Sequence, residues 1–120
     1  MIGIGVDLVK ITRVRRAINR RGDRFVSRIL ASGERQECPK DVALDEWVAG
    51  RFAVKEAGLK ALGTGWAEGV AFGQVRVLQD GTLGFSGKAG ERADSLGVVN
   101  SRVSLTIQGD LIAAVVILDR

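Results

Sequence analysis

Residues 45–63 carry the sequence DEWVAGRFAVKEAGLKALG, which predicts the longest helix of the chain. Apolar side chains recur at helical spacing from Trp47 to Leu62. Asp45 is a typical N-cap residue, and Gly63 is a typical C-cap residue because glycine tolerates the left-handed conformation in which many helices end. Alanine and glycine are frequent in the stretch, so other elements can approach it closely. We therefore expect a long central helix.

The segments around this helix predict an α+β fold. We expect a buried strand over residues 2–9, a helix from Thr12 that ends at Gly22, and a second helix that Asp23 caps. Residues 31–41 have no regular pattern. Later in the chain we expect a type I′ hairpin around Asp80-Gly81 (strands 72–78 and 82–85), a short helix over 87–96 and a second hairpin (strands 102–107 and 111–118). Helices first and antiparallel strands later indicate an antiparallel sheet packed on the central helix.

The length and composition limit the class of protein. A chain of 120 residues fits one domain over residues 1–120. Its single cysteine, Cys38, has no internal disulfide partner, which indicates a reducing setting. The sequence has neither an apolar run that would span a bilayer nor a signal-peptide layout, so we expect a cytoplasmic protein.

The sequence contains no histidine. Zinc sites of the Cys/His type, Ser-His-Asp and Cys-His catalysis and imidazole acid–base chemistry are therefore excluded. Any catalysis must use carboxylates, lysines, hydroxyls or a hard metal ion.

The net charge of +4 is unevenly distributed. Residues 10–35 hold nine basic and two acidic residues, which gives this segment a charge of +7. Such a segment suggests an acidic partner, whether protein, nucleic acid or phosphate-rich ligand, although a charged helix face is more often merely solvated. Nucleic acid is the weaker alternative, because Phe25 is the one aromatic residue in the segment and tyrosine is absent from the chain.

Two carboxylates are candidates for chemistry. Asp7 lies in an apolar strand, where it needs a cation, hydrogen-bond donors or a place at the strand end, capping a turn. Glu56 lies four residues before Lys60, so it is either half of an exposed ion pair or a functional group. Together the two carboxylates would suit Mg²⁺, which takes one or two protein carboxylates with water and phosphate oxygens. Lys55, Lys60 and the backbone of residues 63–65 would then receive phosphate charge, unless the glycines only cap the helix.

Three blocks of sequence carry a resemblance to a known family. GIGVDLV (residues 3–9), GRFAVKEA with KALGTG (residues 50–57 and 60–65) and VSLT (residues 103–106) occur in the order found in the holo-[acyl-carrier-protein] synthases, the small phosphopantetheinyl transferases of bacteria. The resemblance spans the chain and includes Phe25, Arg28-Ile29 and Glu34. P-loop and Rossmann motifs are absent.

The resemblance implies transfer of the 4′-phosphopantetheine arm of coenzyme A to a serine of apo acyl carrier protein, in support of fatty acid biosynthesis. It implies Mg²⁺ held by the residues matching Asp7 and Glu56, either of which would accept the serine proton. It further implies a homotrimer with sites at the subunit interfaces. The expected coenzyme A contacts are Lys60, Lys55, Arg51, Gly63, Thr64, Gly65, Ser104 and Thr106, and the expected carrier-protein contacts are Arg13, Arg16 and Arg20.

Two residues depart from the family pattern. Lys10 stands where the family usually has a glutamate, and Ile107 stands where it has a histidine beside the coenzyme A phosphates. The second departure suggests lowered activity, a rearranged phosphate contact, or a degenerate paralogue that binds without turnover. The intact carboxylate pair favours a working enzyme.

Overall fold

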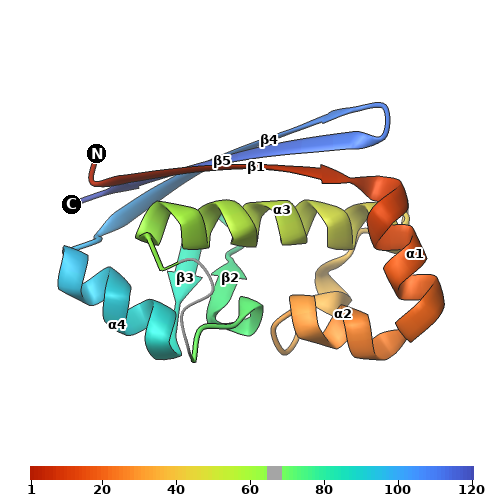
Figure 1. The fold of residues 1–120 in the computed structure, drawn as a ribbon, viewed down its shortest axis with the longest axis horizontal. Coiled ribbons are helices and arrows are strands. Elements are labelled where there is room, and N and C mark those ends of the chain that lie inside the picture. The colour runs from red at the N-terminus through yellow and green to blue at the C-terminus, as the bar shows by residue number, and fades with distance from the viewer. Residues whose placement is uncertain (65–68) are drawn as a thin grey trace.

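The computed structural model describes residues 1–64 and 69–120 and has the expected α+β architecture. Strands β1 (Gly3–Lys10), β5 (Leu111–Asp119) and β4 (Asn100–Gln108) form an antiparallel sheet in the order β1-β5-β4. Helix α3 (Leu44–Leu62) lies along one face of this sheet (Figure 1).

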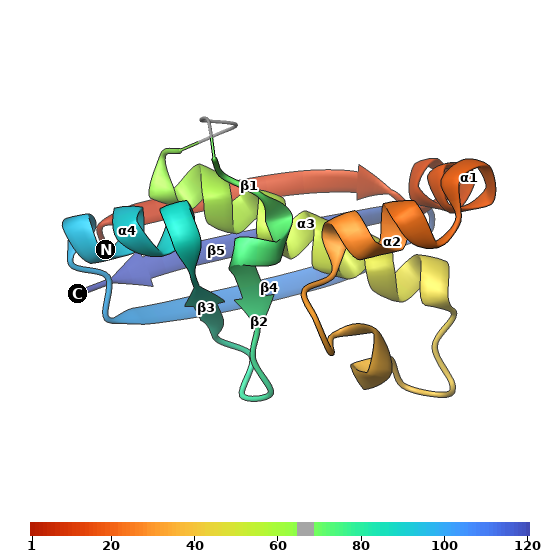
Figure 2. The same ribbon diagram turned by 90° about the horizontal axis from the view of Figure 1, so that it is seen from below.

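The remaining elements lie beside α3 or on its other side. Helix α1 (Ile11–Arg21) follows β1 directly and turns at Gly22 into α2 (Asp23–Ile29). Strands β2 (Val75–Val77) and β3 (Leu83–Phe85) form a small hairpin, and α4 (Gly87–Leu96) leads into β4. Figures 1 and 2 show α2, this hairpin and α4 on the side of α3 that faces away from the sheet. Two short 3-10 helices cover Arg35–Glu37 and Phe72–Gln74.

Two glycines allow α3 to lie directly on β1. A Cβ atom at Gly5 would lie 1.9 Å from the carbonyl oxygen of Ala57, and one at Gly3 would lie 2.2 Å from that of Ala61. Both distances are far below van der Waals contact, so only glycine fits at either position. The backbone contact fixes the position of α3 along the strand.

The register separates the sheet into two faces. Gly5 pairs with Val116 and Val9 pairs with Ile112, and all four residues lie on the buried face against α3. The alternate residues of β1, namely Ile4, Val6 and Leu8, are exposed apolar side chains on the opposite face. The sheet thus has a packed face and an uncovered apolar face.

Helix α1 is buried along a narrow stripe only. Ile11 and Val14 are its buried residues, whereas its arginines are exposed.

Within residues 1–64 and 69–120, no helix is long and apolar enough to cross a membrane.

The predicted helix caps at Asp45 and Asp23 are wrong. Ala43 is the N-cap of α3, and the Asp45 carboxylate in the first turn accepts a hydrogen bond from Nε of Arg15 at 2.5 Å. Gly22 is the N-cap of α2, and Asp23 pairs with Arg35 instead. In both cases an arginine distant in sequence binds the carboxylate, and Asp45 also accepts a hydrogen bond from the N–H group of Glu46 in the first turn of α3. The predicted end of α3 at Gly63 is confirmed, with φ at 74°.

The predicted turn at Asp80-Gly81 forms with a different geometry. A type I′ turn needs positive φ at both central residues, but only Gly81 has it, at 85°. Gly81 N–H donates to the Leu78 carbonyl, and Leu78 N–H donates to the Thr82 carbonyl, so the hairpin has a longer connection that ends in a left-handed glycine. The Asp80 carboxylate accepts bonds from the N–H and hydroxyl of Thr82 instead. The second predicted hairpin is confirmed.

Candidate active site

Asp7, Glu56 and Lys60 come together between β1 and α3. Asp7 lies on the packed face of β1, two residues from Gly5, and Glu56 and Lys60 lie one helical turn apart on α3. The Lys60 ammonium donates to Oδ1 of Asp7 at 2.8 Å and to the Val6 carbonyl at 3.1 Å. The alternative of an exposed Glu56–Lys60 ion pair is therefore wrong, because Lys60 bonds across to the strand.

The charges of the three groups influence one another. Burial raises the pKa of Glu56, and the nearby Asp7 charge raises it further, while Lys60 acts in the opposite direction. The hydrogen bond to Asp7 is the main cause that raises the pKa of Lys60. The two carboxylates are thus close enough to repel each other, which is the arrangement that a shared cation would relieve.

The donor set fits a magnesium ion. Mg²⁺ dehydrates reluctantly and is usually bound through one or two carboxylates together with waters and substrate phosphates. Asp7 and Glu56 provide two such carboxylates, and the described part of the chain holds no group of three or more His, Cys, Asp or Glu side chains that could hold a metal ion. This set suits a metal ion that a phosphate substrate completes, and it does not suit a closed structural site.

A groove extends from this carboxylate pair along α1. Its volume is about 940 Å³, and Asp7 and Glu56 line one part of it. Three of its lining residues are the arginines expected to contact the carrier protein, Arg13, Arg16 and Arg20.

Sequence reasoning missed Lys10, Arg21 and Phe52 as groove residues, and it used Phe25 only as a mark of resemblance. Helical spacing offered a signal for two of these residues, since Phe52 precedes Glu56 by four residues and Arg21 follows Ala17 by four.

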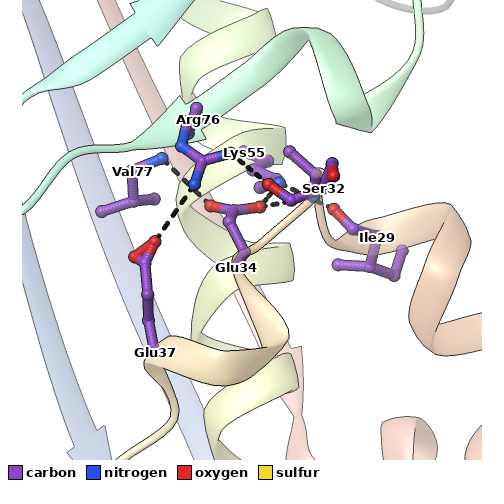
Figure 3. Close-up of polar contacts among 8 residues, drawn as sticks. Ile29, Ser32, Glu34, Glu37, Lys55, Arg76 and Val77 are labelled. Atoms are coloured by element: carbon purple, nitrogen blue, oxygen red, sulfur yellow. Dashed lines mark hydrogen bonds and ion pairs between the residues drawn. The ribbon is translucent and has the colours of Figure 1, made fainter.

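The structure corrects the expectation for Lys55. Its side chain is fully buried, and its ammonium donates to the carbonyl of Ile29 at 2.7 Å and to the equally buried Glu34 carboxylate (Figure 3). Glu34 also accepts from the N–H groups of Ala31 and Val77. Burial lowers the pKa of Lys55, against the opposing effect of Glu34. Lys55 therefore anchors the loop after α2 and strand β2 to α3, and it does not face a phosphate.

Arg51 lies on α3 one turn before Lys55 and outside the groove. Its guanidinium stacks on the ring of Trp47 at 4.5 Å, and burial lowers its pKa. At the other end of α3, the Gly63 N–H donates to the Lys60 carbonyl, and the Thr64 hydroxyl donates to the Leu59 carbonyl at 3.4 Å. Gly63 therefore caps the C-terminal end of α3, as the capping alternative predicted. Thr64 follows it and is bonded to the last turn of the helix. Gly65 lies outside the described residues.

Ser104 and Thr106 lie on the other face of the sheet from the carboxylates. Ser104 pairs with Val115, which pairs with Val6, so its side chain shares the uncovered face with Val6. The same register places Ile107 on the α3 side, where its side chain is exposed. Within one chain, the β4 residues are thus not brought to Asp7 and Glu56.

Comparisons with known proteins show the family to which the chain belongs. Residues 3–116 match the profile of the 4′-phosphopantetheinyl transferase superfamily. The holo-[acyl-carrier-protein] synthase of Maridesulfovibrio salexigens is 41% identical, covering 100% of this chain and 99% of its own length, and that of Solidesulfovibrio magneticus is 44% identical, covering 98% and 97%.

Solved structures give the same result. The holo-[acyl-carrier-protein] synthase of Neisseria meningitidis superimposes with a TM-score of 0.84 at 32% identity over 100% of both chains. That of Bacillus anthracis, a complex with coenzyme A (3′,5′-ADP), has a TM-score of 0.74 at 32% identity, covering 98% of this chain and 95% of its own. The chain therefore belongs to the holo-[acyl-carrier-protein] synthase family of the 4′-phosphopantetheinyl transferase superfamily.

Proposed function

We propose that this chain, as a single domain over residues 1–120, transfers the 4′-phosphopantetheine group of coenzyme A to a serine hydroxyl of apo acyl carrier protein, and so supports fatty acid biosynthesis. The observation that carries the proposal is the Asp7–Glu56 carboxylate pair beside Lys60, at one part of a groove lined with arginines. The Bacillus anthracis relative, which binds coenzyme A, supports the choice of donor.

The residues have separate roles in this reaction. Asp7 and Glu56 would hold Mg²⁺, which supplies positive charge to the pyrophosphate and favours the leaving group. Lys60 is the cation beside them that would contact the same phosphates. Either carboxylate would accept the serine proton, directly or through a water molecule.

The direct test is mass spectrometry of the carrier protein. The purified chain, incubated with Mg²⁺, coenzyme A and apo acyl carrier protein, should add the mass of phosphopantetheine to the carrier. Chelation of the metal should stop the reaction. If no carrier protein from the source organism gains this mass although binding is measurable, the proposed activity is wrong.

The arginines of α1 would bind the acidic surface of the carrier protein. Changing Arg13, Arg16 and Arg20 together to glutamate should raise KM for the carrier about 10- to 100-fold, because complementary charge steers and orients the encounter. The KM for coenzyme A should change little. Arg28→Glu is the control, since Arg28 is exposed in the same basic segment but does not line the groove. An equal effect of the control would mean that net charge, rather than this groove, governs binding.

Ile107 favours a second candidate function, that of a degenerate paralogue which binds coenzyme A or carrier protein without turnover. Ile107→His tests it, because the change restores the family residue at an exposed position. For a working enzyme we expect turnover to rise by no more than about tenfold, since the metal ion that the carboxylates would hold supplies the main electrostatic effect. If only the histidine variant modifies the carrier protein, the degenerate candidate is correct.

We also propose a homotrimer. The uncovered sheet face carries the exposed apolar side chains Ile4, Val6 and Leu8, and such a patch on a small protein favours burial against other copies. Assembly through this face would leave Ser104 and Thr106 at an interface between copies. Light scattering measures the mass directly, and Val6→Lys should reduce it to that of a smaller species.

A further inference from the structure

We propose that Lys60 is an exchangeable counter-ion: it neutralises Asp7 while the site lacks a divalent cation, and cation binding releases its ammonium for the coenzyme A phosphates. This inference rests on the proposed function, because it assigns the metal to Asp7 and Glu56. It adds a coupling between metal binding and phosphate binding that passes through one side chain.

The contacts of Asp7 carry the first step. Its side chain is 13% exposed, so its charge needs a partner. Within residues 1–64 and 69–120, its one hydrogen bond is the 2.8 Å bond from Lys60, whose second contact, the carbonyl of Val6, belongs to the neighbouring residue of the same strand. In the absence of a metal, the charge of Asp7 is therefore neutralised by Lys60.

The exposure of Lys60 carries the second step. Its side chain is 49% exposed, and a lysine ammonium on a flexible four-carbon stem can change position at little cost. A Mg²⁺ ion lies about 2.1 Å from a carboxylate oxygen, so a metal ion and the ammonium on the same Oδ1 atom would repel each other strongly. A metal ion at Asp7 therefore displaces Lys60, and the displaced ammonium remains close to the site.

The coupling follows from this exchange. The apparent metal affinity is reduced by the fraction of time for which Lys60 holds Asp7. A phosphate that binds the ammonium removes this competitor, so coenzyme A and metal ion each favour the binding of the other. Removal of the ammonium should therefore tighten metal binding in the absence of coenzyme A and weaken coenzyme A binding.

The test is Mn²⁺ binding to the full chain without coenzyme A, measured from the electron paramagnetic resonance signal of the free ion. Lys60→Met should bind Mn²⁺ about tenfold more tightly than the unaltered chain. Lys60→Gln, a neutral side chain that can still donate to Asp7, guards against misfolding of the methionine variant and should bind with intermediate affinity. Lys10→Met is the matched control, because Lys10 is a lysine of the same groove without a hydrogen bond to Asp7. Its affinity should stay within about twofold of the original.

A second readout follows Lys60 itself. In chain labelled with ¹⁵N-lysine, the Nζ signal that Lys60→Gln removes should shift when Mg²⁺ is added, because the ammonium leaves Asp7. An unchanged signal at saturating Mg²⁺ overturns the proposal.

The remaining outcomes separate this inference from the proposed function. If Lys60→Met binds Mn²⁺ no more tightly than the unaltered chain, while Asp7→Asn abolishes binding, the exchange is wrong and the metal site stands. If Lys10→Met tightens binding as much as Lys60→Met, the effect is one of general charge and the exchange is again wrong. If Asp7→Asn leaves Mn²⁺ binding unchanged, both the exchange and the metal site are wrong.

Discussion

Gly5→Ala is expected to destabilise the fold by at least about 3 kcal/mol, because the new methyl group would collide with the backbone of α3. Its Cβ would lie 1.9 Å from the carbonyl oxygen of Ala57 and 2.7 Å from the amide nitrogen of Ala61. Neither atom belongs to a side chain that can rotate away, so strand and helix must separate. Thermal unfolding should show a midpoint lower by about 10 °C or more.

The same collision should disturb the site in any molecules that still fold. Gly5 lies two residues before Asp7, and Ala57 follows Glu56, so separation of β1 from α3 increases the distance between the two carboxylates. Gly73→Ala is the matched control, since a Cβ at Gly73 meets nothing within 4 Å, and its effect should stay within about 0.5 kcal/mol. Equal midpoints for the two variants would show that the close approach at Gly5 does not limit stability.

Asp7→Asn is expected to lower the rate of phosphopantetheine transfer about 10³-fold, which corresponds to about 4 kcal/mol of transition-state stabilisation. An amide of the same shape lacks the charge with which Asp7 would hold the proposed metal ion. The fold should survive, because the Asp7–Lys60 ion pair is half exposed at its lysine and such pairs contribute about 1 kcal/mol or less. Rates from the mass assay at several Mg²⁺ concentrations measure the loss.

Glu56→Gln should lower the rate of phosphopantetheine transfer about as much as Asp7→Asn does. Unlike Asp7→Asn, it should not lower the free energy of unfolding. The folded-state pKa of Glu56 is raised, so its ionisation in the fold is unfavourable and stability falls as the pH rises from the ordinary glutamate pKa through the raised one. At pH 7 without metal, Glu56→Gln should therefore be as stable as the original chain or slightly more stable. Asp41→Asn, an exposed change of the same chemical kind, should alter neither property. A rate for Glu56→Gln close to that of Asp41→Asn would rule out a metal-binding role.

The sequence predicts most of the elements, because their signals are local. Helical spacing and the left-handed preference of glycine place the end of α3 at Gly63, and β-branched alternation gives β4 and β5. The errors arise where a distant partner competes with the local preference. Asp45 would cap α3 by its position, but Arg15, 30 residues earlier, binds its carboxylate.

In the candidate site, too, local features can be predicted from the sequence, whereas contacts with distant residues cannot. An aspartate in an apolar strand needs a cation, hydrogen-bond donors or a place at the strand end, and the structure provides a cation, Lys60. Sequence spacing cannot show which lysine of α3 faces the strand, since that depends on how the helix is rotated. The sequence predicts Lys55 beside phosphates, but the helix directs it to Glu34, 21 residues away in sequence, in the buried network of Figure 3.

The narrow buried stripe of α1 has a consequence for the diversification of this protein. Ile11 and Val14 pack the helix against the core, whereas Arg13, Arg16 and Arg20 are exposed and line the groove. The residues that hold the helix in place and those that meet a partner are thus different sets on different faces. The charge pattern of α1 can therefore be exchanged for another without loss of folding, so a few surface substitutions would change the protein partner that we propose for this groove while Asp7 and Glu56 remain as they are.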